Sequence, residues 1–193
     1  GLGTALVSVD DGGDEIPGAI AYRDIVARGG RMPAAAPRGA ELRLYTGGTT
    51  GAPKAVVWEV DTLLVARRQS TWGMIGVEPP ETLAEAVEIA VSADRRRVVT
   101  LPLSPLLHGT AQSTTMGTLA IGGTIVLHAR PRMDMDEAYR LIRDHGATRL
   151  IVAGDVLALP LAEAAERGDG LPGVDSIVSS GMRFSDDVKR RLH

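Results

Sequence analysis

Residues 45–54 read Tyr-Thr-Gly-Gly-Thr-Thr-Gly-Ala-Pro-Lys, and the interpretation of the whole sequence starts from this stretch. Three glycines in one turn allow positive φ angles and a close approach of the backbone to a ligand. Successive backbone N–H groups in such a turn bind anions, and the hydroxyls of Thr46, Thr49 and Thr50 add further donors. Lys54 supplies a point charge suited to phosphate and is one of only two lysines, against nineteen arginines. The stretch therefore predicts a loop that binds a polyphosphate.

Two common phosphate loops do not match these residues. A Walker A loop has Ser or Thr directly after its lysine, whereas Ala55 follows Lys54 and Pro53 precedes it. A dinucleotide loop needs G-x-G-x-x-G at the start of a helix, whereas the glycines here have another spacing and residues 55–58 predict a strand. A hairpin turn that binds nothing is the alternative, and the added threonines, proline and lysine make it the weaker interpretation.

Outward from this loop, short apolar stretches alternate with helical patterns. Continuous apolar strands between helices of ten or more residues predict an α/β fold, a doubly wound and mainly parallel sheet with helices on both faces. We expect residues 1–40 to be an irregular segment ending in a Pro/Ala-rich linker, and residues 41–193 to form the α/β unit. The expected strands are 42–45, 55–58, 98–101, 124–127, 150–152 and 177–178, and the expected helices are 61–72, 79–92, 108–120, 134–145, 157–167 and 185–192.

Two of these helices carry clear terminal signals. In 79–92, Thr82 and Glu85 have the spacing of a capping box, and apolar residues recur at helical spacing. In 134–145, Asp134 is the expected N-cap, and Gly146 follows the last helical residue. The expected apolar faces are Leu83, Ala86, Val87, Ala90 and Val91 in the first helix, and Met135, Ala138, Leu141 and Ile142 in the second.

Composition excludes several classes of protein. The chain has 193 residues, 44% of them hydrophobic and 23% charged, with no cysteine, which argues against disorder, a disulfide scaffold and a zinc–cysteine module. A net charge of −3 argues against nucleic-acid binding. No apolar run approaches the ~20 residues of a membrane span, and the early acidic residues do not fit a secretory signal, so we expect a cytoplasmic protein. Because the chain begins with Gly1, we also expect a processed product or a piece of something longer.

The loop resembles the phosphate-binding loop of adenylate-forming enzymes, which include acyl- and aryl-CoA synthetases, luciferases and peptide-synthetase adenylation domains. Their pattern is aromatic-T-[SG]-G-T-T-G-x-P-K-G-V, from which this chain departs at Ala55, where glycine is usual. The Thr-Gly-Gly form, together with the later motifs, is most similar to actinobacterial-type fatty-acyl-CoA synthetases. The resemblance implies a subdomain of the large N-terminal domain of such an enzyme.

Three later segments follow the family's order. Residues 101–109 are similar to its second motif, a proline–leucine strand end followed by the pair His108 and Gly109. Residues 122–127 match the strand that follows a helix. Residues 177–182 are similar to the acyl-pocket turn, although Ser180 and Met182 differ from the small residues usual there.

The resemblance implies an ATP-dependent ligase. In the family a carboxylate attacks the α-phosphorus of Mg²⁺-bound ATP, and the thiol of coenzyme A then attacks the acyl-adenylate and releases AMP. The implied catalytic residues are Lys54, Thr49 and His108, with His108 at the acyl–adenylate junction. The implied partner is a small carboxylic acid, a fatty acid first, with steroid side-chain and aromatic acids open. The phosphate-binding residues are Thr46, Gly47, Gly48, Thr49, Thr50, Gly51 and Lys54, and the substrate-binding residues are His108, Gly109, Ser180 and Gly181.

Several motifs that the family requires are not found in these residues: the acidic motif that stacks adenine and holds Mg²⁺, the ribose-binding aspartate, and the C-terminal domain with its lysine. We therefore expect the chain alone to be inactive. Two other interpretations stay open, a non-catalytic module that binds ATP or pyrophosphate and an unrelated α/β domain that acts through protein contacts. The run Arg95–Arg97 is interpreted as a solvated face rather than a contact for coenzyme A phosphates, and the sequence does not indicate an oligomeric state.

Overall fold

The computed structural model describes residues 6–10, 16–30, 39–46, 54–92, 94–129 and 133–193. Its contacts divide the chain into two units, Gly1–Ala40 and Glu41–His193. The first unit is not wholly irregular as expected, because β1 (Val7–Ser8) pairs in parallel with β2 (Ile20–Ala21) and α1 (Tyr22–Arg28) follows. Two-residue strands and a seven-residue helix that buries no side chain are too short for periodicity to reveal. Most of the expected linker lies outside the described residues.

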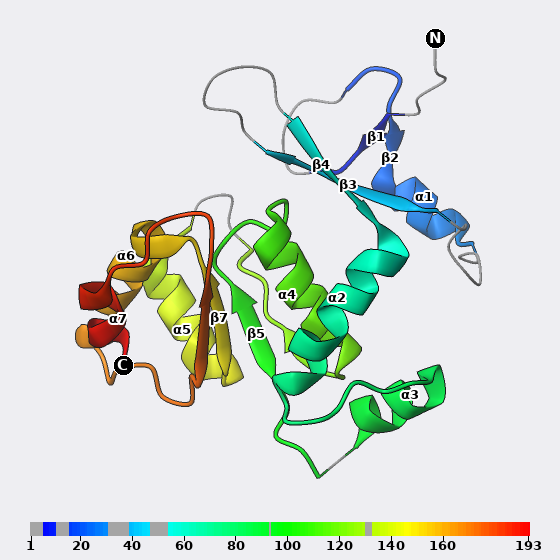
Figure 1. Cartoon of the computed structure of the whole chain (residues 1–193). Helices are drawn as coiled ribbons and strands as arrows, with labels where there is room; N and C mark the ends of the chain where they lie inside the picture. The colour runs from blue at the N-terminus through cyan, green and yellow to red at the C-terminus, as the bar shows by residue number, and fades with distance from the viewer. Residues whose placement is uncertain (1–5, 11–15, 31–38, 47–53, 93, 130–132) are drawn as a thin grey trace. The chain divides into compact units, whose positions relative to one another are not determined.

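In the second unit, the strands on either side of the glycine–threonine loop form an antiparallel hairpin (Figure 1). They are β3 (Glu41–Thr46) and β4 (Lys54–Glu59), paired from Glu41 opposite Glu59 to Thr46 opposite Lys54. The strand expected after the loop is therefore confirmed, and with it the argument against a dinucleotide loop. The helix expected next is α2 (Val60–Gly73).

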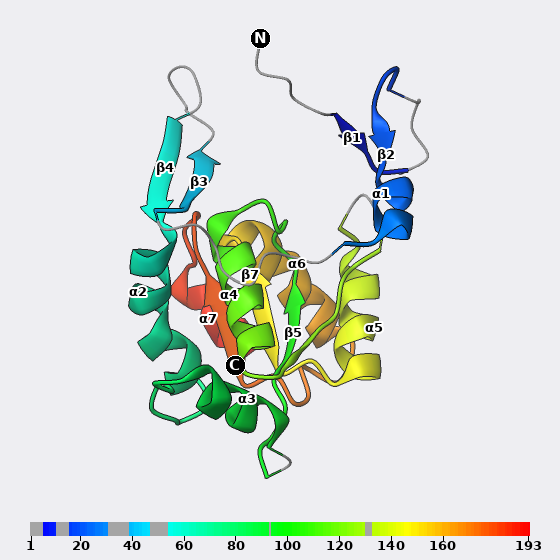
Figure 2. The same ribbon diagram turned by 90° about the vertical axis from the view of Figure 1, so that its right-hand side faces the viewer.

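A four-stranded parallel sheet is the centre of the second unit. Its strand order is β6-β5-β7-β8, and α4, α5 and α6 are the successive connections. The chain steps from β5 outward to β6 and then returns past β5 to β7 and β8. Because parallel crossovers are right-handed, this reversal places α4 on one face of the sheet and α5 and α6 on the other (Figures 1 and 2). The doubly wound α/β prediction is confirmed. The elements are β5 (Val99–Pro102), α4 (Gly109–Ala120), β6 (Thr124–Ile125), α5 (Met135–His145), β7 (Arg149–Val152), α6 (Gly154–Glu166), β8 (Ser176–Ser179) and α7 (Asp186–Leu192).

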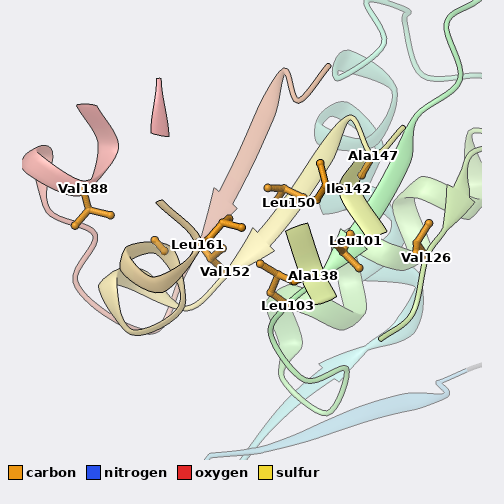
Figure 3. Packing of buried hydrophobic residues seen from close by; sticks show 11 residues of the cluster. Leu101, Leu103, Val126, Ala138, Ile142, Ala147, Leu150, Val152, Leu161 and Val188 are labelled. Atoms are coloured by element: carbon orange, nitrogen blue, oxygen red, sulfur yellow. The ribbon is translucent and has the colours of Figure 1, made fainter. Parts of the chain in front are cut away.

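The main core lies between this sheet and α5, α6 and α7 (Figure 3). Leu150 and Val152 extend from β7 on one face, as alternation along a strand requires. They belong to one buried cluster with Leu101 of β5, Ile142 of α5 and Leu161 of α6. Each of these side chains is at most 1% exposed, so the cluster fixes the positions of the strand ends beyond it.

The expected helix caps of the two clearest helices are confirmed. Asp134 accepts hydrogen bonds from the backbone N–H groups of Asp136 and Glu137, and Gly146 has the left-handed conformation (φ 60°, ψ 47°). Before α3 (Leu83–Val91), the hydroxyl of Thr82 accepts from the backbone N–H of Glu85 at 3.2 Å. The second capping-box bond differs from expectation, because the Glu85 carboxylate accepts from the N–H of Glu81 instead of Thr82.

Replacing Asp134 by alanine is expected to lower the free energy of unfolding by about 1 kcal/mol, because two N–H groups at the start of α5 lose their acceptor. Urea unfolding of the purified chain measures this change. Asp144→Ala, at the opposite end of the same helix, is the control and is expected to be neutral within about 0.5 kcal/mol. Equal effects of the two substitutions would contradict the capping role of Asp134.

Two helices differ from their predicted form. The apolar face of α3 is largely exposed, with Leu83 81%, Val87 51% and Val91 70% exposed. The helical spacing of apolar residues therefore predicted the helix correctly but not the burial of its apolar face. The helix expected to begin at 157 begins at Gly154 and contains Pro160 in its interior. Among the described residues, no helix has the length and apolar character needed to cross a bilayer.

Candidate functional site

The carboxyl edge of the parallel sheet is where this topology places a ligand. The connections from β5 and β7 leave in opposite directions although the two strands are neighbours, so a crevice opens beyond their carboxyl ends. The segment with His108 follows β5, Gly154 follows β7, and the turn with Ser180 and Gly181 follows β8. The fold thus brings to one edge three segments that are far apart in the sequence.

The chain beyond β5 is tied to β7. The backbone N–H groups of Leu103 and Ser104 both donate to the carbonyl of Ile151, at 2.9 and 3.1 Å. Ser104 is buried, and its Oγ has no hydrogen-bond partner among the residues that the structure describes. A buried hydroxyl without a partner next to the crevice is a polar group available to a ligand. Sequence reasoning missed Ser104, although its place directly after a buried strand was visible.

His108 lies at the N-cap position of α4. Its N–H donates to the carbonyl of Pro105 at 3.0 Å, and its carbonyl accepts from the N–H of Gln112 at 2.9 Å. The residue has an extended backbone (φ −86°, ψ 135°), its side chain is not used as a cap, and it is exposed. The backbone is therefore fixed while the imidazole is accessible, as a residue that contacts substrate requires.

Gly109 joins this segment to the hairpin. A Cβ atom built on Gly109 would lie 3.0 Å from Cδ1 of Leu44 in β3, so the strand packs closely on the first turn of α4. Leu44 precedes Thr46 by two residues, and Thr46 is paired with Lys54 across the hairpin. The hairpin that carries the glycine–threonine loop thus packs on Gly109 two residues before the loop begins.

The central residues of the loop fall outside the described part of the chain, namely Gly47, Gly48, Thr49, Thr50 and Gly51. Their phosphate contacts stay a prediction. The structure describes the two six-residue strands on either side of the loop, which pair in register and hold Thr46 and Lys54 opposite each other at its two ends. The side chain of Lys54 is exposed.

The turn with Ser180 and Gly181 is attached to the start of α6. Gly181 has φ +82°, a conformation that favours glycine. Ser179 Oγ accepts from the N–H of Gly154 at 3.0 Å, and Asp155 Oδ1 accepts from the N–H of Ser185 at 2.8 Å. The N–H of Asp155 also donates to the carbonyl of Arg183 at 2.9 Å. These bonds hold the turn at both of its ends. The sequence did not identify Gly154 and Asp155, which form them from the start of α6.

An apolar pocket of about 500 Å³ lies between β3, α2 and α4. Leu42 and Leu44 of the hairpin, Trp72 of α2 and Met116 of α4 line it, and Gly109 reaches it at the His108 end of α4. Such a volume and such a lining suit a hydrocarbon chain or ring. The pocket was not predicted, because Trp58 of β4 and Ala86 of α3 also line it, and the sequence does not reveal how these five elements pack together.

A metal site would need several His, Cys, Asp or Glu side chains close together. No group of three or more His, Cys, Asp or Glu side chains able to hold a metal ion is found in the described ranges. His128 has a buried side chain that accepts from the N–H of Asp134 at 3.4 Å and lies 3.7 Å from the Glu137 carboxylate. These contacts give His128 a structural role.

Residues 19–193 match the model of the family described as AMP-binding enzyme. The chain belongs to this family. Membership excludes the interpretation as an unrelated α/β domain.

Curated relatives of this AMP-binding chain are acyl-CoA ligases. It is 30% identical over 161 residues to a 3-oxocholest-4-en-26-oate–CoA ligase of Rhodococcus rhodochrous, a match that covers 77% of the chain and 27% of the relative. It is 31% identical over 188 residues to the medium-chain acyl-CoA ligase Mig of Mycobacterium avium, covering 95% and 34%. The chain therefore spans about a third of the length of the curated relatives it matches.

Solved structures of adenylate-forming enzymes share the fold. The N-terminal domain of FACL13 from Mycobacterium tuberculosis, with an inhibitor bound, gives a TM-score of 0.63 at 19% identity, covering 90% of the chain and 40% of that structure. O-succinylbenzoate coenzyme A synthetase from Bacillus subtilis, in complex with AMP, gives 0.61 at 19% identity, covering 90% and 32%. At these identities the likeness shows the fold of the AMP-binding chain.

Proposed function

We propose that this chain is the part of an acyl-CoA ligase that binds the ATP phosphates and the acyl group. The complete ligase joins a small carboxylic acid to ATP as an acyl-adenylate and then transfers the acyl group to coenzyme A. The observation that carries the proposal is the family match over residues 19–193, together with a hairpin that holds Thr46 and Lys54 opposite each other and packs on Gly109 beside His108. Acyl-CoA ligases among the relatives support the reaction class.

In this proposal each segment at the carboxyl edge has one task. The glycine–threonine loop and Lys54 hold the β- and γ-phosphates, so pyrophosphate leaves into a site already arranged for its charge. His108 contacts the junction between the acyl group and the α-phosphate. Ser180 and Gly181 line the path of the carboxylate, supported by the bonds from Gly154 and Asp155 to residues 179–185.

The acid is the less specified substrate. Gly109 lines the pocket between β3, α2 and α4, so in this proposal an aliphatic or ring-containing acid lies in the pocket with its carboxylate toward neighbouring His108. Both a fatty acid and a steroid side-chain acid fit an apolar pocket, and the relatives' names include both classes. We propose a fatty acid as the first substrate to test, and the cytoplasm, which holds ATP and coenzyme A, as the compartment.

Mg²⁺ accompanies ATP in this reaction, where it neutralises phosphate charge. The described residues offer no cluster of carboxylates or imidazoles for it, so they do not fit a protein-held metal site.

The isolated 193-residue chain is expected to show no ATP–pyrophosphate exchange with any fatty acid, because the adenine and Mg²⁺ motifs that the resemblance requires are not in its sequence. A longer ligase that contains this chain is expected to show fatty-acid-dependent exchange. Exchange measured with labelled pyrophosphate compares the two. Exchange by the isolated chain would contradict its incompleteness, and binding of ATP without exchange in the longer protein would favour the non-catalytic module instead.

A further inference from the structure

Arg149 is a charged residue inside the parallel sheet. It is the first residue of β7, paired with Thr100 of β5 on one side and Ser176 of β8 on the other. Leu150 and Val152 of the same strand pack in the core against α5 and α6, so alternation places Arg149 on the other face. Only 4% of Arg149 is exposed.

The guanidinium of Arg149 lacks bonds that its burial calls for. Its Nε and Nη1 have no hydrogen-bond partner among the residues that the structure describes. Burial lowers the pKa of Arg149, and the negative charge of Asp175 raises that pKa by a smaller amount. Asp175 is already engaged, because its Oδ2 lies 3.2 Å from Nη1 of Arg96. Since an arginine stays charged at pH 7 and a buried charge without hydrogen bonds is unfavourable, this geometry calls for an anion.

The room for such an anion is a pocket of about 450 Å³ beside Arg149. Its size lies in the range of small-molecule sites. Four arginines and a single aspartate line it: Arg149, the run Arg95, Arg96 and Arg97, and Asp175. Arg96 is fixed by a hydrogen bond to the carbonyl of Gly173 at 2.8 Å, while Arg95 and Arg97 form no ion pair within the described ranges.

This pocket is separate from the carboxyl-edge site. Val98, Thr148 and Ser176, which also line it, stand at the amino ends of β5, β7 and β8. The strands of the sheet are parallel, so these ends form the edge opposite to the one that carries His108, Gly154 and Ser180. The pocket therefore belongs to neither the loop nor the acyl path of the proposed function.

We infer that this amino-edge pocket binds the phosphate group of a small phosphorylated metabolite, held by Arg149 with Arg95 and Arg97 around it. A phosphate offers several acceptor oxygens and about two negative charges, which match planar guanidinium donors better than a single carboxylate does. The run Arg95–Arg97, interpreted from sequence as a solvated face, becomes one wall of a binding site because the turn before β5 places it beside the buried Arg149.

The test titrates inorganic phosphate into the 193-residue chain carrying Lys54→Ala, which removes the loop lysine from the comparison, at constant ionic strength. The readouts are the NMR signal of the Arg149 Nε–Hε group and the heat of binding. We expect a saturable shift of that signal. Arg149→Met is expected to weaken binding at least about tenfold, whereas Arg140→Met, an exposed arginine of α5, should change it by less than about twofold.

Stability separates a ligand site from a structural charge. In chloride buffer Arg149→Met should be at least as stable as its parent, because it removes a buried charge without hydrogen bonds at two of its nitrogens. Loss of folding in Arg149→Met, or an Arg149 signal that phosphate does not move in the parent, would overturn the inference. Ribose 5-phosphate should bind at least as tightly as inorganic phosphate, and binding of the inorganic ion alone would overturn the assignment to a metabolite. Arg149→Lys, which keeps the charge but not the planar donors, should bind phosphate more weakly than the parent.

Discussion

Replacing Lys54 by alanine in the complete ligase is expected to slow adenylation by about 10²- to 10³-fold, the range for removing one preorganised donor from a developing charge. The register places Lys54 opposite Thr46, at the end of the loop that holds the departing pyrophosphate in our proposal. Binding of the fatty acid should change little, because the apolar pocket does not include Lys54. Single-turnover formation of the acyl-adenylate measures the effect, and Thr49→Ala should act in the same direction.

Lys189→Ala is the matched control, since Lys189 is the chain's other lysine. It lies on α7, where its ammonium pairs with the exposed carboxylate of Asp186 at 3.0 Å. Its removal should leave the adenylation rate unchanged and stability within about 0.5 kcal/mol. Equal rates for Lys54→Ala and the parent would remove Lys54 from the site.

Gly154→Ala is expected to lower the free energy of unfolding by about 3 kcal/mol or more. Gly154 has φ +53°, where an alanine is strained by roughly 1–2 kcal/mol. Its Cβ would also lie 2.2 Å from the carbonyl oxygen of Arg183 and 2.7 Å from Cβ of Met182, so the turn after β8 would have to move. In the complete ligase that movement should also raise the KM for the acid, because the turn carries Ser180 and Gly181.

Gly170→Ala provides the comparison for the strain alone. Gly170 has φ +74°, and nothing lies within 4 Å of a Cβ built there. Alanine at this position should cost about 1 kcal/mol. Urea unfolding of both variants separates the two contributions, and a Gly154→Ala variant no less stable than Gly170→Ala would contradict the close packing of the turn on α6.

Much of the second unit could be predicted because its elements carry local signals. Helix α5 has a capping aspartate, a glycine at its end and an apolar stripe, and the structure confirms all three. Strand β7 contains the apolar run Leu150–Val152, and β5 is mostly apolar, which is typical of a sheet covered on both faces. The spacing of apolar residues along a helix does not indicate which element packs on its apolar face. For this reason the sequence did not reveal that the apolar face of α3 is largely exposed. The expected start of α6 at residue 157 is three residues late, because Pro160 obscures the helical pattern there, whereas tertiary packing of Leu161 and the bonds at Gly154 hold the longer helix.

The candidate site could be predicted only where the functional residues are consecutive in the sequence. The stretch from Tyr45 to Lys54 could be interpreted directly because its glycines, threonines and lysine act together. Ser104, Gly154 and Asp155 are held by hydrogen bonds to residues far along the chain, Ser104 through its backbone N–H to Ile151. Arg149 becomes a candidate binding residue only because it is buried beside the turn that precedes β5. A single sequence does not contain those distances, so such residues were found only in the folded chain.

NMR titration of the ¹⁵N-labelled chain with inorganic pyrophosphate examines the loop itself. We expect saturable shifts of the backbone amide signals of Gly47, Gly48, Thr49, Thr50 and Gly51, abolished by Lys54→Ala and retained in Lys189→Ala. Loop amides that stay unmoved at saturating pyrophosphate, or that move equally in both variants, would contradict the claim that this turn holds the phosphates of a nucleotide.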